Sequence, residues 1–110
     1  MDFKINPGEF RHPITIQKST VIKNGDGIPE CIWNDLLNTR AKVINVHGDE
    51  YYKALSTGVK IEKTFYIRFD RSKNITENDR VIYNNEIYDI KYVNDIKDMN
   101  IYLEIKGEKL

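Results

Sequence analysis

The feature that most constrains the fold is an alternation of apolar and polar residues that recurs in several short segments. Ile14 and Ile16 alternate with polar neighbours, and Phe65, Ile67 and Phe69 repeat the pattern later in the chain. A period of two places alternate side chains on one face of an extended strand. Polar turns containing Gly and Asn separate these segments. The pattern therefore predicts a mainly β protein, a small antiparallel barrel or sandwich.

We expect about six strands and at most one short helix, with an SH3-like or related barrel as the preferred architecture. Asn84-Asn85 lies between two strand patterns and predicts a tight hairpin, because Asn tolerates left-handed turn conformations. Ala41 and Val43 are expected on one face of their strand, with Ile44 and Val46 on the other. The expected core-facing sets are Tyr88 with Ile90 and Tyr92, and Ile101 with Leu103 and Ile105. The predicted strands cover residues 13–18, 40–46, 63–70, 79–83, 86–93 and 100–106.

The remaining segments are expected to be connections within a single domain, residues 1–110. Residues 1–12 form an N-terminal arm, and residues 19–39 form a long connection with a turn at Asn24-Gly25-Asp26-Gly27. We expect the side chains of Trp33, Leu36 and Leu37 to pack beneath the barrel. Residues 47–62 form a long loop, or a loop with a short helix, between the second and third strands.

The charge balance argues against nucleic acid as the main binding partner. Lys plus Arg and Asp plus Glu are equal at 17 each, so the formal net charge is zero. A protein that holds DNA by its phosphates usually carries a basic excess. Zero net charge instead leaves little repulsion between copies of the chain. The N-terminus lacks an apolar signal core and the single Cys31 has no partner for an internal disulfide, so we expect an intracellular product.

No arrangement of residues indicates catalysis or metal binding. The two histidines, His12 and His47, lie far apart beside turn residues, whereas a metal site needs clustered ligands. We interpret Cys31 as a half-buried small apolar residue rather than a nucleophile. Acidic residues such as Glu50, Glu62 and Asp70 are interpreted as parts of solvated faces. The sequence therefore predicts a protein that is not an enzyme and has no cofactor.

The order of the segments resembles the phage head–tail joining family, the head-completion or stopper proteins of siphophage-type connectors. The similarity covers about residues 6–106, and no single motif carries it alone. An arm leads into Ile14-Thr15-Ile16-Gln17, a loop containing Gly25 and Gly27 leads to Trp33, and a strand and a closing hairpin follow. The matching segments are residues 6–17, 40–43, 48–50, 65–69, 79–83, 86–90 and 102–105.

The resemblance implies a structural subunit of the head–tail connector. Such a subunit adds below the portal and adaptor proteins as a ring, often of about twelve copies, closes the capsid exit after DNA packaging and offers a docking surface to the tail. It implies a location at the head–tail interface of the virion, with assembly in the host cytoplasm and only passing contact with genomic DNA. Alone, such a subunit is expected to be a monomer or weak oligomer.

In some members of this family the loop between the second and third strands reaches into the channel and forms the plug. The resemblance places this role on the loop at residues 47–62, and the alternative is an ordinary surface excursion. The candidate residues of this channel loop are Gly48, Asp49, Glu50, Tyr51, Tyr52, Leu55 and Gly58.

The N-terminal arm is a second candidate contact, through Phe3, Ile5, Phe10 and Arg11. Its alternative is a disordered terminus.

Two other functions also remain open for the whole chain. One is a tail-completion or tail-terminator ring protein, and the other is a small β-barrel module that binds a peptide or nucleic acid.

Overall fold

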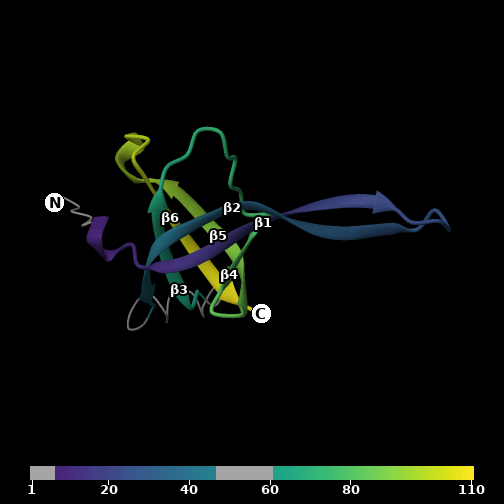
Figure 1. Cartoon of the computed structure of the whole chain (residues 1–110), viewed down its shortest axis with the longest axis horizontal. Helices are drawn as coiled ribbons and strands as arrows, with labels where there is room; N and C mark the ends of the chain where they lie inside the picture. Colours follow the sequence, from purple (N-terminus) through teal and green to yellow (C-terminus); the bar gives the residue numbers. More distant parts are fainter. Residues whose placement is uncertain (1–6, 47–60) are drawn as a thin grey trace.

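The computed structural model describes residues 7–46 and 61–110, which form one closed antiparallel barrel with a long hairpin projecting from it (Figure 1). The strands follow the order β1-β2-β3-β6-β5-β4 around the barrel. A 3-10 helix, η1 (Pro7–Glu9), precedes the first strand, and a second, η2 (Ile96–Asp98), follows the fifth. The strands are β1 (His12–Lys23), β2 (Pro29–Asn45), β3 (Lys63–Arg68), β4 (Arg80–Tyr83), β5 (Glu86–Asp95) and β6 (Tyr102–Lys109).

The predicted mainly β barrel of about six strands is confirmed. Within the described ranges no helix is long and apolar enough to cross a membrane. The barrel core is built from the alternating positions that the sequence indicated, and Phe65 lies at its centre with its ring edge-on to those of Tyr83 and Tyr88. The buried core members are Ile14, Ile16, Ala41, Phe65, Ile67, Ile75, Val81, Tyr88, Ile90, Leu103 and Ile105.

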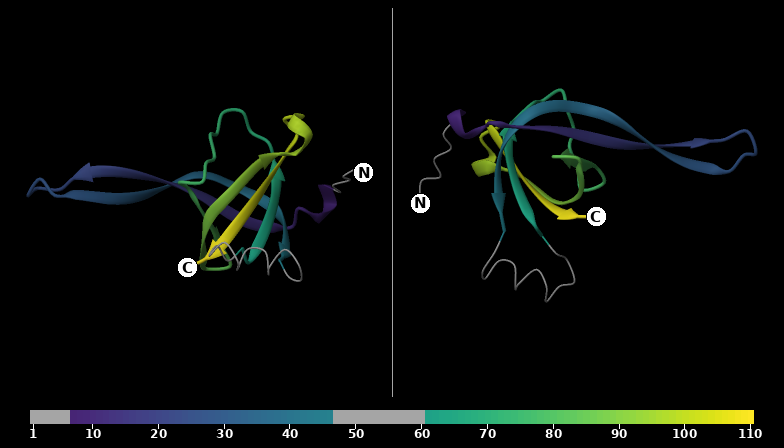
Figure 2. Two further views of the ribbon diagram at one scale, coloured as in Figure 1. Left: turned by 180° about the vertical axis from the view of Figure 1, so that it is seen from behind. Right: turned by 60° about the horizontal axis from the view of Figure 1, so that its bottom comes forward.

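The turn between β4 and β5 is the predicted hairpin. Asn84 and Asn85 both have positive φ, at 52° and 63°. Two consecutive left-handed residues match the right-handed twist of the flanking strands, which explains Asn at both positions. At the same end of the barrel β2 ends, β3 begins and β6 reaches the C-terminus (Figure 2).

The prediction of a long connection over residues 19–39 is wrong. β1 and β2 pair without interruption from His12↔Ala41 to Lys23↔Pro29, apart from one bulge beside Gln17. Only the turn at residues 24–27 was placed correctly. The outer part of this hairpin does not pack against the core. Its sequence therefore lacks the alternation of apolar and polar residues that is typical of a half-buried strand.

Two residues expected in the core are exposed. Tyr92 is 44% exposed, because a register shift between Ile90 and Tyr92 turns the rest of β5 around. Such a bulge inserts an extra residue and reverses the facing of those that follow. Ile101 is 47% exposed because it precedes β6 and follows Asn100, whose φ is 57°.

Candidate assembly surfaces

The most prominent surface is the outer part of the β1–β2 hairpin, which we call the arm (residues 18–34). Among the described residues β4 pairs with β1 at Thr15 to Gln17, and β3 pairs with β2 from Lys42 to Asn45. The two strands of the arm therefore pair with each other alone. All views show the arm extending away from the barrel (Figures 1 and 2).

A cluster of polar contacts fixes the root of the arm on the barrel. The Arg80 guanidinium lies 4.1 Å from the centre of the Trp33 ring, and its Nε donates a hydrogen bond to Gln17 at 2.8 Å. The Gln17 amide in turn donates to the Asp35 carboxylate at 2.9 Å. Trp33 is therefore held by β4 on the outside of the barrel, and the expectation that it tucks beneath the barrel is wrong.

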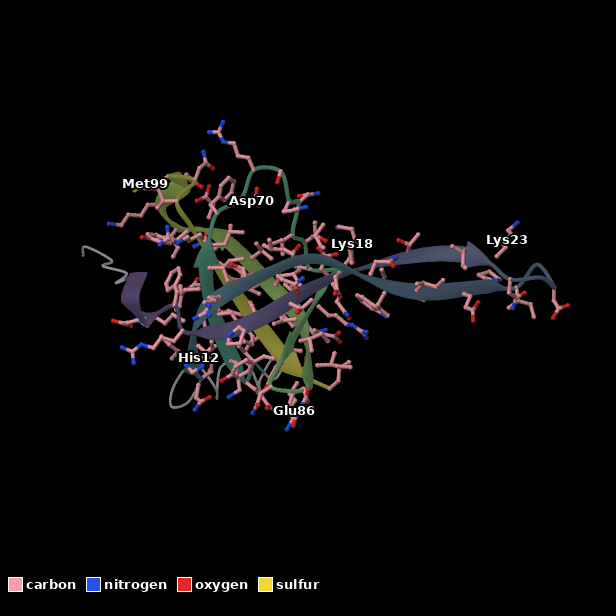
Figure 3. All side chains as sticks on the ribbon, viewed as in Figure 1. His12, Lys18, Lys23, Asp70, Glu86 and Met99 are labelled. Carbon is pink, nitrogen blue, oxygen red and sulfur yellow. The ribbon has the colours of Figure 1, made fainter. Side chains whose placement is uncertain are left out.

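A second contact at the root is a partly buried ion pair. Lys18 Nζ lies 3.1 Å and 3.2 Å from the two carboxylate oxygens of Asp79, whose side chain is 1% exposed. The same carboxylate accepts a hydrogen bond from the Thr76 backbone N–H at 2.9 Å. Figure 3 shows Lys18 where the arm leaves the barrel and Lys23 near its tip. The pair ties the arm to the segment that leads into β4.

The tip of the arm is a compact turn organised by Asn24. Its side-chain oxygen accepts hydrogen bonds from the backbone N–H groups of Asp26 and Ile28, at 2.9 Å and 3.1 Å. Gly27 has a φ of 77°, a conformation that other residues adopt at a cost. The tip is therefore well defined even though it projects into solvent.

The arm exposes apolar side chains along its length. The exposed fractions are 69% for Val21, 58% for Ile28, 42% for Ile22 and 37% for Ile32. Cys31 pairs with Val21 and is also exposed, so its interpretation as a half-buried residue is wrong. An isolated two-stranded ribbon is marginally stable in water. A ribbon with this much exposed apolar surface is typical of an element that another surface covers.

A second surface lies at the other end of β1. A cavity of about 260 Å³ is lined by Glu9, Arg11, His12, Lys42 and Val43. Lys42 and Glu9 form an ion pair at 2.7 Å across it. The Arg11 side chain donates to the Gly8 carbonyl at 3.0 Å and is exposed. We call this surface the η1 end.

The structure describes only part of the expected N-terminal assembly arm. Phe10 is 8% exposed, and its ring packs edge-on against Tyr102 with ring centres 5.6 Å apart. Phe3 and Ile5 lie outside the described residues. Phe10 therefore anchors η1 to the barrel, while Arg11 next to it faces outward.

The candidate channel loop also lies outside the described residues, which include neither Gly48, Asp49, Glu50, Tyr51, Tyr52, Leu55 nor Gly58. The positions that flank it are well fixed. The Val46 N–H donates to the Glu62 carbonyl at 3.0 Å, and the Glu62 N–H donates to the Gly107 carbonyl at 2.9 Å. Ile61 is buried. The loop therefore leaves and rejoins the barrel at two adjacent points.

No group of three or more His, Cys, Asp or Glu side chains among residues 7–46 and 61–110 is placed to hold a metal ion. Hydrogen bonds from the Ser72 hydroxyl and backbone N–H lower the pKa of Asp70, which closes a turn. Burial raises the pKa of the Tyr88 phenol, which belongs to the core.

The sequence of the arm carries a signal for a hairpin. Thr20-Val21-Ile22 and Cys31-Ile32-Trp33 are rich in β-branched and aromatic residues, and they flank the Asn-Gly-Asp-Gly turn symmetrically. Such runs on either side of a turn are typical of a hairpin even where no face is buried.

Comparisons with known proteins match the chain to one family and to two solved structures of similar fold. A family model described as phage head completion protein matches residues 5–110. The solution structure of protein SF1141 from Shigella flexneri 2a has a TM-score of 0.70 and 22% identity, with 96% of each chain covered. A chain in the virion of a native gene transfer agent particle has a TM-score of 0.60 and 13% identity, covering 91% of this chain and 94% of that one. These two likenesses show the fold. No curated protein matches the chain.

Proposed function

This chain belongs to the phage head completion protein family, and from that membership we propose that it forms a ring below the portal and adaptor proteins. The family assigns it a structural role at the head–tail connector of the phage particle. In our proposal the ring closes the capsid exit after DNA packaging and provides the surface on which the tail docks. The single observation that carries the proposal is the family match, which spans residues 5–110.

The architecture supports a ring subunit. A closed barrel has no free sheet edge of its own, so it is a rigid unit that does not aggregate through its strands. The arm and the η1 end then offer surfaces through which such a unit can contact its neighbours. A formal net charge of zero leaves little long-range repulsion between neighbouring copies.

We further propose that residues 47–60 face the channel. The flanking hydrogen bond from the Val46 N–H to the Glu62 carbonyl fastens the two ends of this segment together. The two points at which this segment is attached are therefore fixed side by side on the barrel. The carboxylates of Asp49 and Glu50 would disfavour binding to the phosphates of passing DNA.

The test is electron microscopy of DNA-filled, tail-less capsids with and without the purified protein. A new ring of density at the portal vertex, together with retention of the packaged DNA, is expected. Decoration of isolated tail tubes instead would support the tail-completion alternative. Binding to neither particle would refute both proposals.

The channel role is tested by a variant in which a short Gly/Ser linker replaces residues 48–59. Because Val46 and Glu62 are hydrogen-bonded neighbours, a short linker can join them without strain. The variant is expected to add a ring to capsids but to let DNA escape. A ring that still retains DNA would show that this segment is not the plug.

A further inference from the structure

The arm presents apolar side chains on both of its faces. Val21 pairs with Cys31, and Thr20 pairs with Ile32 on the adjacent rung. Because side chains alternate along each strand, these two pairs project from opposite faces of the ribbon. Val21 is 69% exposed and Ile32 is 37% exposed. The arm therefore has apolar surface to bury on either of its faces.

The η1 end lies at the opposite end of β1 from the tip of the arm. β1 begins beside the cavity at His12 and ends next to the tip at Lys23, so one strand connects the two surfaces. A strand of this length separates them by roughly 36 Å, at about 3.3 Å per residue. Figure 1 shows them at opposite ends of the long axis of the molecule, which extends over 55 Å. The arm of a chain therefore does not reach its own η1 end.

The charges of the two surfaces are complementary. Around the tip, Asp26 and Glu30 carry carboxylates and Lys23 carries the one ammonium group. Among the described residues that line the η1 end, Arg11 and Lys42 carry positive charge and Glu9 carries the one carboxylate, which pairs with Lys42. Each surface also has apolar area, with Ile28 at the tip and Val43 lining the cavity.

We propose that the arm of one subunit docks on the η1 end of the next copy of this chain. This inference rests on the proposed ring, because contacts between two different surfaces of identical subunits generate a ring when the rotation from one subunit to the next closes. The arm extends past the barrel from Lys18 to Lys23, about 17 Å at 3.3 Å per residue. The shorter dimensions of the molecule are 34 Å and 26 Å, so an arm of this length spans at least half of the width of a neighbouring barrel.

The size of the contact predicts that assembly needs a template. A ribbon of two strands is about 10 Å wide, so an arm about 17 Å long buries roughly 170 Å² on one face. A stable interface buries about 800 Å² on each partner. Each arm contact is therefore weak alone. It becomes effective when neighbouring subunits are held on a connector ring, where the local concentration of the partner is high.

Cys31 provides a direct test, because it is the chain's single cysteine and lies exposed on the arm. Gly8→Cys adds a second thiol at the η1 end and leaves Arg11, His12 and Lys42 intact. The variant is added to DNA-filled, tail-less capsids, treated with a short bismaleimide and run on a denaturing gel. We expect a ladder of dimers, trimers and higher multiples. A matched variant with Asn74→Cys, exposed in the loop before β4, is expected to give no ladder.

Three results would overturn the inference while leaving the proposed ring in place. The first is dimers that form with the wild-type chain, which would indicate contact between two arms. The second is attachment of Cys31 to a portal, adaptor or tail protein. The third is a ring visible by microscopy in which Gly8→Cys gives no ladder. Absence of any ring with the wild-type protein would refute the proposed function itself. If Gly8→Cys does not fold by circular dichroism, Arg11→Cys is used in the same assay.

Discussion

Replacing Asp79 with Ala tests whether the ion pair at the root of the arm stabilises the barrel. Its side chain is 1% exposed and accepts three hydrogen bonds, two from Lys18 Nζ and one from the Thr76 N–H. Removing one partner of a buried pair costs about 3–5 kcal/mol. The Lys18 side chain is 39% exposed and regains water when Asp79 is lost, so we expect the low end, about 3 kcal/mol.

The measurement is urea and thermal unfolding followed by far-UV circular dichroism and by the fluorescence of Trp33, the chain's single tryptophan. A loss of about 3 kcal/mol corresponds to a fall in melting temperature of about 15 °C for a domain of this size. Asp79→Asn keeps an oxygen that accepts from the Thr76 N–H but removes the charge, and should cost about 2 kcal/mol. Glu77→Ala, an exposed carboxylate nearby, is the control and should stay within about 0.5 kcal/mol.

A double-mutant cycle decides whether the ion pair is the cause. If Lys18 and Asp79 stabilise the protein through each other, Lys18→Ala combined with Asp79→Ala costs less than the sum of the two single variants by about 1–2 kcal/mol. Additive costs, agreeing within about 0.5 kcal/mol, would refute the reasoning. A loss below about 0.5 kcal/mol for Asp79→Ala would refute it as well.

Two further changes test the packing of the barrel and of the arm root. Gly107→Ala is expected to destabilise the fold by about 1–3 kcal/mol in urea unfolding, because the added Cβ would lie 3.0 Å from Tyr88 Cβ, and no change would contradict this. Gly25→Ala is the matched control: its Cβ meets nothing within 4 Å, so stability should be unchanged or rise by up to about 1 kcal/mol. Arg80→Ala should shift the Trp33 emission to longer wavelength and cost about 1 kcal/mol, because it uncovers the ring; an unchanged spectrum would show that the two side chains do not stack in solution.

Much of the barrel could be predicted from local pattern. Ile14 and Ile16 alternate with polar residues and are buried, and the same holds for Phe65 and Ile67. These positions were predictable because a strand with one buried face has an apolar residue at every second position. The Asn84-Asn85 turn was predictable for a different reason, since its backbone conformation restricts the residue types directly.

The errors share a physical cause, which is that the burial of a residue depends on distant parts of the chain. Tyr92 continues the pattern of Tyr88 and Ile90, yet a bulge in the pairing of β5 with β6 turns it outward. Cys31 is a residue type that is usually buried, yet it lies on an arm with no barrel behind it. The bulge has no local signature, and the residue types of the arm indicate a hairpin but not that it projects from the barrel.

The sequence by itself determined the strand periodicity, one of the tight turns and the family, because these depend on neighbouring residues and on the order of segments. Only the tertiary structure decided which strand surfaces remain uncovered. β1 is paired on both sides near Ile16 but only with β2 beyond Gln17, and that change occurs where the barrel closes. Closure brings β4 beside β1 across more than 60 residues of chain, as the pairing of Gln17 with Arg80 shows. Pairing between segments so far apart produces no repeating pattern in either segment. The point at which the arm leaves the barrel is therefore known only from the folded structure.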